Sequence, residues 1–478
     1  SGKSALSSAK DLTVQAKQHG TTAVKAYQAA LSGGLSVNAA FAQSKSSGAT
    51  NVTLSDSSLL GGVGGAINEE TGEAYGATIL AEDTGKTTSE VVGITGSLGY
   101  AGGALITNAE NDSSTKVTIN QGSTIASTGA TSVTANKANG ISASTLGGAI
   151  GAGALQGIVA YAEDKGNSAI TLTDANKLGG DSISILAKGA PNVTADAKAL
   201  SGALLGAVGA SLATAKAGGE VSLSVGDGST FSGKNVTLGA AAGQQTGTDD
   251  TAQANAKANA VGLSAALGGS FQANVADAYQ NTAVTVSVGK SSYKADTLAI
   301  SGTNSSALDA DAKGVTVGTI ASGENISQMT GSLTTNVSAS GTADGSSLGS
   351  VTLRSSGYGN LANNASGAGG GLVGISPTAA EADTTFTTNT QTNVNGSWQA
   401  GSLTASATNS DDVDATADSL SAAVIGASGT EMTTKVSHTA KIQRGRHRYY
   451  HRGSELHGGQ YRGPRREPER AAATAALP

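Results

Sequence analysis

The fold is decided by one stretch, residues 251–288, which reads TAQANAKANAVGLSAALGGSFQANVADAYQNTAVTVSV. Its first ten residues alternate polar side chains with alanine, so an extended chain places methyl groups on one side and polar groups on the other. A helix of the same residues would have no apolar stripe to bury. After the glycine-rich passage 262–269, residues 284–288 alternate again, with branched side chains that suit a pleated, half-buried surface. The stretch therefore predicts two strands separated by a small-residue passage.

The composition fits thin layers rather than a large globular core. The 478 residues include 68 glycines, 3% aromatic residues and 13% charged residues, whereas charged residues usually make up about a quarter of a chain. Leu, Ile, Val and Phe are too few to fill a compact domain. With no cysteine, neither disulfides nor thiolate metal sites can hold the fold together. The chain opens Ser1-Gly2-Lys3, so we expect it to be a fragment of a longer protein.

Two kinds of short apolar anchor recur along the chain. The first kind begins at Leu12, Val133, Ile183, Val236, Leu298, Val351 and Leu403, with a degenerate copy predicted at residues 78–80. The second kind begins at Val52, Val117, Ile170, Val221 and Val284, and weaker copies are expected at residues 333–337, at Phe386 and at Val436. A spacing of roughly 50–60 residues indicates an array of supersecondary units. We therefore predict seven or eight diverged copies of one repeat.

A glycine and alanine patch lies between the two anchors of each repeat. The patches include residues 33–34, 102–103, 147–148, 202–209, 268–269, 369–374 and 422–426. Such a repeat cannot bury its own apolar side and must stack on its neighbours. We therefore predict an all-β parallel β-helix, or β-solenoid. Two rungs per repeat would give roughly sixteen rungs and a rod about 75 Å long. Polar clusters such as residues 409–412 are expected to form turns.

The chain divides into a body, residues 1–441, and a basic tail, residues 442–478. The tail reads IQRGRHRYYHRGSELHGGQYRGPRREPERAAATAALP and holds eight of the nine arginines. We predict that it is disordered, and we hypothesise a frameshift. Read one nucleotide later, its Arg and Gly codons become codons for the residues of the body. Sequencing of the locus tests this hypothesis.

The body is acidic. The whole chain carries 29 basic and 35 acidic residues. The tail contributes eight arginines and three glutamates to these totals, so the body has a net charge of −11. An acidic surface gives no support for binding nucleic acid.

Several short motifs resemble catalytic or cofactor sites, but each lacks its partners. Residues 345–349 match G-x-S-x-G, yet that motif needs a strand-to-helix turn with His and Asp partners. Residues 369–374 fit G-x-G-x-x-G without a surrounding βαβ unit, and residues 85–87 lack the upstream glycine of a P-loop. Residues 226–228 lack the tandem repeat that supplies calcium ligands. We therefore predict no catalytic residue, no cofactor-binding residue, no metal ligand and no cofactor.

Two further segments allow two interpretations each. Residues 138–162 carry no charge and have the small-xxx-small spacing of membrane helices, but their polar residues and glycines favour buried strands. Residues 384–392 alternate threonine with other residues. They could form the threonine ladder of an ice-binding face, although a solvated strand is the commoner meaning.

The repeats resemble those of large filamentous adhesins of the leukotoxin type, which are similar to filamentous haemagglutinins. The similarity is carried by SISILAKGAPNVTADAKALSGALLGAVGASLATAKAGGEVSLSV (residues 182–225) and SLTASATNSDDVDATADSLSAAVIGASG (residues 402–429). It covers about residues 1–441. It implies a non-catalytic β-helical stalk with an adhesive surface, secreted or attached to the bacterial cell surface and active in adhesion or biofilm. It also implies an outer-membrane secretion partner and a host-cell or biofilm ligand.

Two rival functions remain open at this point. The first is a membrane-active toxin segment that inserts its Gly/Ala-rich patches. The second is a β-helix polysaccharide lyase or hydrolase, which needs a patch of carboxylates or basic groups on one face, and no acidic pair recurs here at the required spacing.

Overall fold

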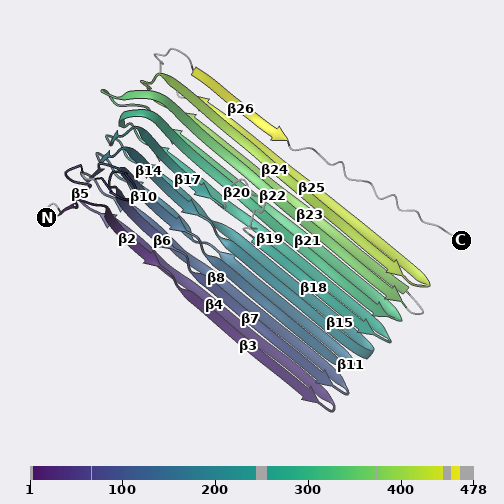
Figure 1. Cartoon of the computed structure of the whole chain (residues 1–478). Coiled ribbons are helices and arrows are strands. Elements are labelled where there is room, and N and C mark those ends of the chain that lie inside the picture. The colour runs from purple at the N-terminus through teal and green to yellow at the C-terminus, as the bar shows by residue number, and fades with distance from the viewer. Residues whose placement is uncertain (1–3, 66, 244–255, 372–374, 445–453, 463–478) are drawn as a thin grey trace.

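The computed structural model describes residues 4–65, 67–243, 256–371, 375–444 and 454–462. Within these ranges the chain forms 26 β-strands and no helix. Strands that pair along the stack run parallel to each other, as in β11 with β15 and β20 with β22. Figure 1 shows them side by side in the order of the sequence. The prediction of an all-β protein with parallel strands is confirmed.

The strands form four parallel arrays. The short array contains β1 (Ser4–Ser7), β5 (Ser57–Gly61), β9 (Thr124–Ser127), β13 (Lys177–Gly179), β16 (Thr230–Ser232) and the beginning of β20 (Ser292–Gly318). The anchor array contains β2 (Leu12–Gln18), β6 (Ala77–Asp83), β10 (Ala130–Lys137), β14 (Ser182–Gly189), β17 (Asn235–Ala242), parts of β20, β22 (Ser347–Gly371) and β24 (Ser402–Ala422), and β26 (Ser454–Arg462).

The two remaining arrays consist of the long strands. The outgoing array contains β3 (Thr21–Ser32), β7 (Lys86–Ser97), the first halves of β11 (Gly140–Asp164) and β15 (Asn192–Val225), β18 (Ala256–Ala266), and the last parts of β20, β22 and β24. The return array contains β4 (Leu35–Leu54), β8 (Tyr100–Ile119), the second halves of β11 and β15, β12 (Asn167–Leu172), β19 (Gly269–Val288), β21 (Ile320–Ala339), β23 (Ile375–Val394) and β25 (Ile425–Arg444).

Each repeat contributes one level to the stack. Paired residues lie between 50 and 66 positions apart, as with Ile375 and Ile425 or Leu59 and Ile125. This confirms the predicted period, and residues 78–80 are indeed an anchor, because β6 pairs between β2 and β10. The expected two rungs per repeat are wrong. At roughly 4.8 Å per level, the nine strands of the anchor array extend over only about 40 Å, and the long dimension of the molecule runs along the strands.

The second anchors form one column at the end of the return array. Val52, Val117, Ile170, Leu223, Val286 and Val337 are in register, and the column continues through Thr392 and Ile442. The expected anchors at Phe386 and Val436 therefore lie six residues too early. Phe386 belongs to a different core.

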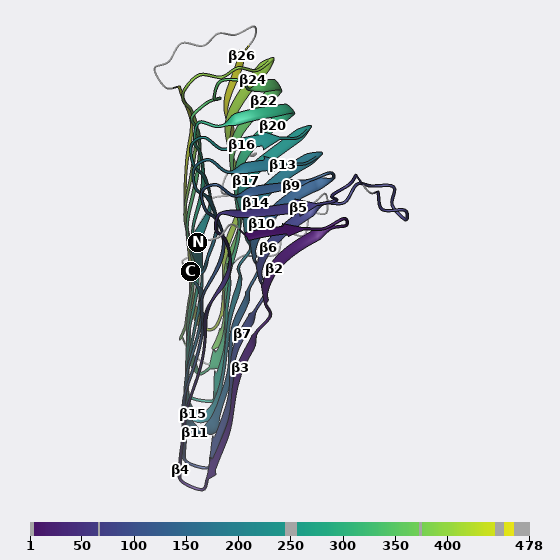
Figure 2. The same cartoon turned by 90° about the vertical axis from the view of Figure 1, so that its left-hand side faces the viewer.

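The interior has two zones along the strands (Figure 2). In the head, the anchor residues build a core of Val, Ile and Leu, together with Trp398 and the stacked rings of Phe231 and Tyr293, whose centroids lie 5.4 Å apart. Farther along the long strands, the core consists mainly of alanine. Short side chains allow two sheets to approach closely, and Figure 2 shows the outgoing and return arrays lying together as a thin blade below the wider head.

Part of the basic tail continues the stack. Residues 442–444 complete β25, and β26 lies parallel to β24. Residues 445–453 and 463–478 lie outside the described residues.

Four successive repeats turn the same corner with a left-handed residue. Asp56, Gly122, Ala175 and Gly228 lie two or three positions after the return strands end and have φ angles of 45°, 81°, 57° and 71°. This region costs an L-residue roughly 1–2 kcal/mol, whereas glycine enters it freely. Alanine at position 175 therefore holds a strained backbone that the repeats on either side avoid.

We expect Ala175→Gly to raise the free energy of unfolding by about 0.5–1 kcal/mol, because relief of the strain exceeds the entropy that glycine adds to the unfolded chain. Urea unfolding followed by circular dichroism measures the change. Ala169→Gly, in the regular strand β12, is the matched control and should lower stability. A loss of stability in Ala175→Gly would contradict this account of the corner.

Candidate functional site

The far end of the blade carries the most unusual surface of the molecule. Here each outgoing strand turns into its return strand. We define the tip as residues 29–41, 94–106, 148–159, 200–212 and 263–275, which are equivalent segments of the first five repeats. The glycine patches at residues 33–34, 102–103, 147–148, 202–209 and 268–269 lie in or directly beside these segments. Figure 2 shows this end as the narrow lower edge of the blade.

Large apolar side chains point outward on both faces of the tip. On the outgoing face the exposed residues are Leu31, Ile94, Ile150, Leu200 and Leu263. On the return face they are Leu35, Val37, Phe41, Tyr100, Ile106, Leu155, Val208 and Phe271. Leu98, Leu204, Leu205 and Leu267 lie at the turns, and Leu98 is 85% exposed. Soluble proteins seldom expose an apolar surface that runs over many adjacent strands.

The interior of the tip is polar instead. One column of the return array alternates amides with glycines through six repeats: Asn38, Gly103, Gln156, Gly209, Gln272 and Gly323. A Cβ on Gly209 would lie 2.0 Å from Oε1 of Gln272. Gly103 and Gly209 therefore provide the space for the amides of the next repeat, Gln156 and Gln272.

A second glycine column faces these amides from the outgoing array. It contains Gly93, Gly147, Gly262, Gly314 and Gly367, with Ala199 in the remaining repeat. A Cβ on Gly147 would lie 2.5 Å from Nε2 of Gln156, so the amide spans the space between the sheets. Asn274 donates to Oδ1 of Asn325 at 2.7 Å and accepts from Nε2 of Gln272 at 2.8 Å. The glycines of these two columns thus leave room for buried amides, which we call the amide ladder. Oε1 of Gln156 and Oε1 of Gln272 have no hydrogen-bond partner in the described structure.

A collar of charged residues and tyrosines lies directly behind the tip. Lys25 pairs with Glu90 at 2.7 Å on the outgoing face, and Lys45 pairs with Glu110 at 3.6 Å on the return face. Nζ of Lys216 lies 5.2 Å from the ring centroid of Tyr161 and 5.3 Å from that of Tyr279. Burial raises the pKa of the Tyr161 hydroxyl and that of the Asp277 carboxyl. The outer surface therefore changes from apolar to charged within a few residues.

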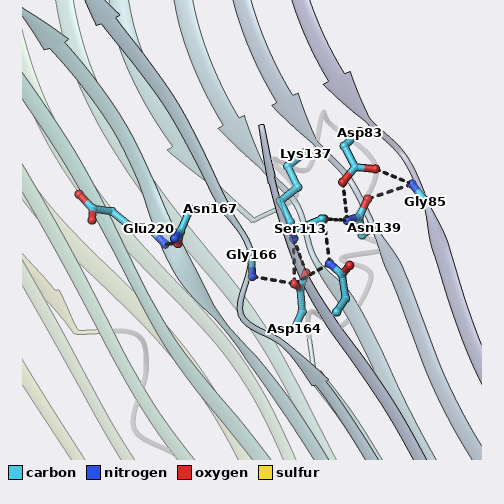
Figure 3. A network of polar contacts seen from close by, with 10 residues as sticks. Asp83, Gly85, Ser113, Lys137, Asn139, Asp164, Gly166, Asn167 and Glu220 are labelled. Carbon is cyan, nitrogen blue, oxygen red and sulfur yellow. Dashed lines mark hydrogen bonds and ion pairs between the residues drawn. The ribbon is translucent and has the colours of Figure 1, made fainter. Parts of the chain in front are cut away.

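A second polar cluster lies where the head narrows into the blade (Figure 3). Nζ of Lys137 contacts both carboxylate oxygens of Asp164, at 2.8 and 2.7 Å, and the two side chains are 2% and 0% exposed. Oδ1 of Asp164 also accepts from Asn111 and from the backbone of Gly166, at 3.0 and 2.9 Å. Nearby, Asn139 donates to Asp83 and to Ser113.

These residues satisfy one another through the hydrogen bonds described above. We therefore assign it a structural role. The open grooves of the described surface lie elsewhere, between neighbouring repeats of the outgoing array, around residues 313–315 and 309–311.

The catalytic and cofactor motifs all fall in strands or corners. Ser347 of the G-x-S-x-G match begins β22, and no helix follows it in the described chain. Of the two histidines in the body, His19 contacts Thr84 and His438 lies 2.9 Å from Asp411. Residues 226–228 form the left-handed corner described above, and residues 85–87 lead into β7. Residues 369–371 end β22, whereas 372–374 lie outside the described residues.

The charge-free segment 138–162 is not a helix. Residues 140–162 belong to β11, which confirms a strand of small residues. Its inward-facing residues are buried, whereas Ile150 and Leu155 are 57% and 59% exposed. Among the described residues, none forms a helix that is long and apolar enough to cross a membrane. The same residues contain no group of three or more His, Cys, Asp or Glu side chains that could hold a metal ion.

The threonine segment 384–392 has neither of the two expected roles. Thr384, Thr388, Thr390 and Thr392 are buried inside the blade. Thr388 donates to Asp411 at 2.8 Å, and Thr392 donates to the carbonyl of Ser406 at 2.7 Å. Thr388 and Thr392 therefore satisfy polar groups of the facing strand, whereas the buried Oγ1 of Thr390 has no hydrogen-bond partner in the described structure.

Sequence reasoning missed the apolar outer surface of the tip. The signal was present in the glycine patches, where Leu, Ile, Val and Phe recur at alternate positions, as in residues 35–41. It could have been found by asking which side of each strand these residues share, because alternate residues of a strand face the same side.

We expect Gly147→Ala to lower the free energy of unfolding by about 1–3 kcal/mol, because the new methyl group would overlap Gln156 and lie 2.8 Å from Cγ2 of Ile158. Gly148→Ala is the matched control, since its Cβ would have no atom within 4 Å. Thermal and urea unfolding of both variants measures the difference. Equal stability of the two variants would contradict the proposed packing of the amide ladder.

We expect Asp164→Asn to lower the free energy of unfolding by about 3–5 kcal/mol, because it leaves the charge of Lys137 buried without a counter-ion. Lys137→Met combined with Asp164→Asn removes both charges and should recover most of this loss. Asp181→Asn, which breaks the exposed pair with Lys234, should leave the urea midpoint unchanged. A double variant as unstable as Asp164→Asn would show that burial of the charge is not the cause.

Comparisons of the chain with protein-family models, with curated proteins and with solved structures found no match. The resemblance to filamentous adhesins therefore rests on the repeats of the sequence alone.

Proposed function

We propose that this chain is a parallel β-solenoid that forms the non-catalytic stalk and adhesive surface of a secreted or cell-surface bacterial adhesin of the filamentous type. One observation supports this proposal above the others. Equivalent residues of successive repeats pair in register from β2 to β24, so the repeats form one continuous stack. A stack of this kind suits a protein that presents a long surface to a partner.

The surface chemistry agrees with a role in presentation rather than in catalysis. The conspicuous buried polar groups, such as Lys137 and Asp164, contact one another rather than a cleft. The outer faces carry small polar residues and paired charges. Exposed large apolar side chains gather at the tip and at turns of later repeats, as at Leu420, Val424 and Ile425. A host-cell or biofilm ligand and an outer-membrane secretion partner belong to the proposal, on the strength of the resemblance.

Adhesion of coated beads tests this proposal. Beads that carry the full folded chain should remain on host epithelial cells or on a biofilm in greater number than beads that carry the heat-unfolded chain or albumin. Retention under flow is the measurement. If the folded chain retains no more beads than albumin on either surface, the proposed adhesive function is wrong.

A further inference from the structure

At the tip, large apolar side chains lie on the outside and polar amides lie inside, which reverses the usual arrangement in a soluble protein. Leu204 and Leu205 at one turn are 62% and 65% exposed, whereas Gln156, Gln272 and Asn274 behind such turns are 3% exposed or less. Burial of polar groups costs free energy unless they are hydrogen-bonded, and exposure of leucine to water forfeits roughly 1.5–3 kcal/mol per side chain. An apolar medium therefore suits the outer surface of the tip better than water does.

The backbone of the tip is suited to an apolar medium. In the first five repeats, each strand of the tip pairs in parallel with the next repeat, as Leu155 does with Val208 and Leu200 with Leu263. The peptide groups between neighbouring repeats are thus hydrogen-bonded to each other. Between neighbouring repeats this meets a requirement of hydrocarbon, where no water is present to pair with free N–H and C=O groups. Residues 29–41, at the start of the stack, pair on one side only, with β7 and β8.

Charge separates the tip from the rest of the blade. None of the five tip segments contains a charged residue. The collar begins immediately behind them, with Lys25, Glu90, Lys45 and Glu110. Tyr161 and Tyr279 lie at this boundary, and tyrosine is enriched where protein crosses the interface between hydrocarbon and water.

The distribution of the apolar residues favours a lipid over a protein partner. A protein that docks on a sheet covers one face, but here the apolar residues lie on both faces and around the edge between them. From Leu35 to Phe41 the apolar surface of the return face runs for about 20 Å along the strand. The hydrocarbon of one leaflet is about 15 Å thick. A thin wedge of this depth fits one leaflet edge-on.

We infer that the tip of the first five repeats inserts edge-on into the hydrocarbon of one leaflet of a lipid bilayer, with the collar at the level of the headgroups. The contact is apolar, so it requires no anionic lipid. The collar carries both signs of charge, which suits a zwitterionic headgroup region. This inference goes beyond the proposed adhesive function, because it places one edge of the blade in lipid.

Flotation with phosphatidylcholine vesicles tests the insertion. The full chain should float with the vesicles at physiological salt. Leu204→Ser combined with Leu205→Ser should lower the apparent partition coefficient at least tenfold, because two leucines no longer leave water. Both positions are exposed, so the fold tolerates the change, and circular dichroism verifies this. Leu6→Ser combined with Val63→Ser replaces exposed residues outside the tip and should leave flotation unchanged.

A fluorescent probe measures the depth. The chain has no cysteine, so Leu204→Cys allows the environment-sensitive dye NBD to be attached at the tip alone. Its emission should shift to the blue on addition of vesicles and be quenched by lipids that carry a doxyl group in the acyl chain. The same dye at Ser224→Cys, an exposed position at the head end of β15, should show neither effect.

Four outcomes would overturn the inference. These are absence of flotation, flotation that needs anionic lipid and disappears in salt, equal flotation of the Leu204 and Leu205 double variant, and equal quenching at Ser224→Cys. Self-association of tips without vesicle binding would indicate a protein partner instead. Bead adhesion without vesicle binding would leave the proposed function intact and remove only this inference.

Discussion

The whole structure depends on the parallel, in-register pairing of each repeat with the next. A single repeat has strands of up to about 20 residues with mostly small side chains, and it cannot bury enough apolar surface to order itself. The hydrogen bonds that complete its strands belong to the repeats on either side. Stability is therefore distributed along the stack as a series of interfaces between neighbours. This pairing determines where the corners, the two cores and the tip lie.

The size of the inward residues determines the width of the molecule at each point along the strands. Val, Ile and Leu, with Phe231 and Trp398, keep the sheets of the head apart. Alanines such as Ala160 and Ala195 bring the outgoing and return arrays together in the blade. At the tip, glycine on one sheet faces an amide on the other. The wedge shape follows from this graded series, and the buried pair of Lys137 and Asp164 lies at the step between the first two zones.

Much of the fold could be predicted from the sequence, because the signals for it are local. Alternation in residues 256–266 and 284–288 predicted strands, and the spacing of the anchors predicted the registers of β14, β17, β20, β22 and β24. The anchor Val133 of β10 lies two residues away from the expected register, because it pairs with Ile185. The number of levels per repeat could not be predicted, because it depends on where the chain turns, and turns of small residues look alike. Residues 409–412 resembled a turn but continue β24, since the partner strand buries Asn409 and Asp411 beside Thr388 and His438.

The candidate site was less predictable than the fold. The sequence located the glycine patches but gave no reason for them, since that reason lies in amides of another strand, such as Gln156 opposite Gly147. The exposed leucines of the tip looked like core residues, because in most proteins apolar residues at alternate positions face inward. Which side of a strand faces out is settled by the facing sheet, and that is a property of the assembled stack.

The alternation of amide and glycine along the return array has a consequence for how such a chain can grow or shrink. Asn38, Gly103, Gln156, Gly209, Gln272 and Gly323 repeat with a period of two levels. Loss or duplication of one level would set two amides, or two glycines, against each other. Loss or duplication of two adjacent levels would preserve the pattern. In this part of the chain, levels can therefore be gained or lost without disturbing the alternation only in adjacent pairs.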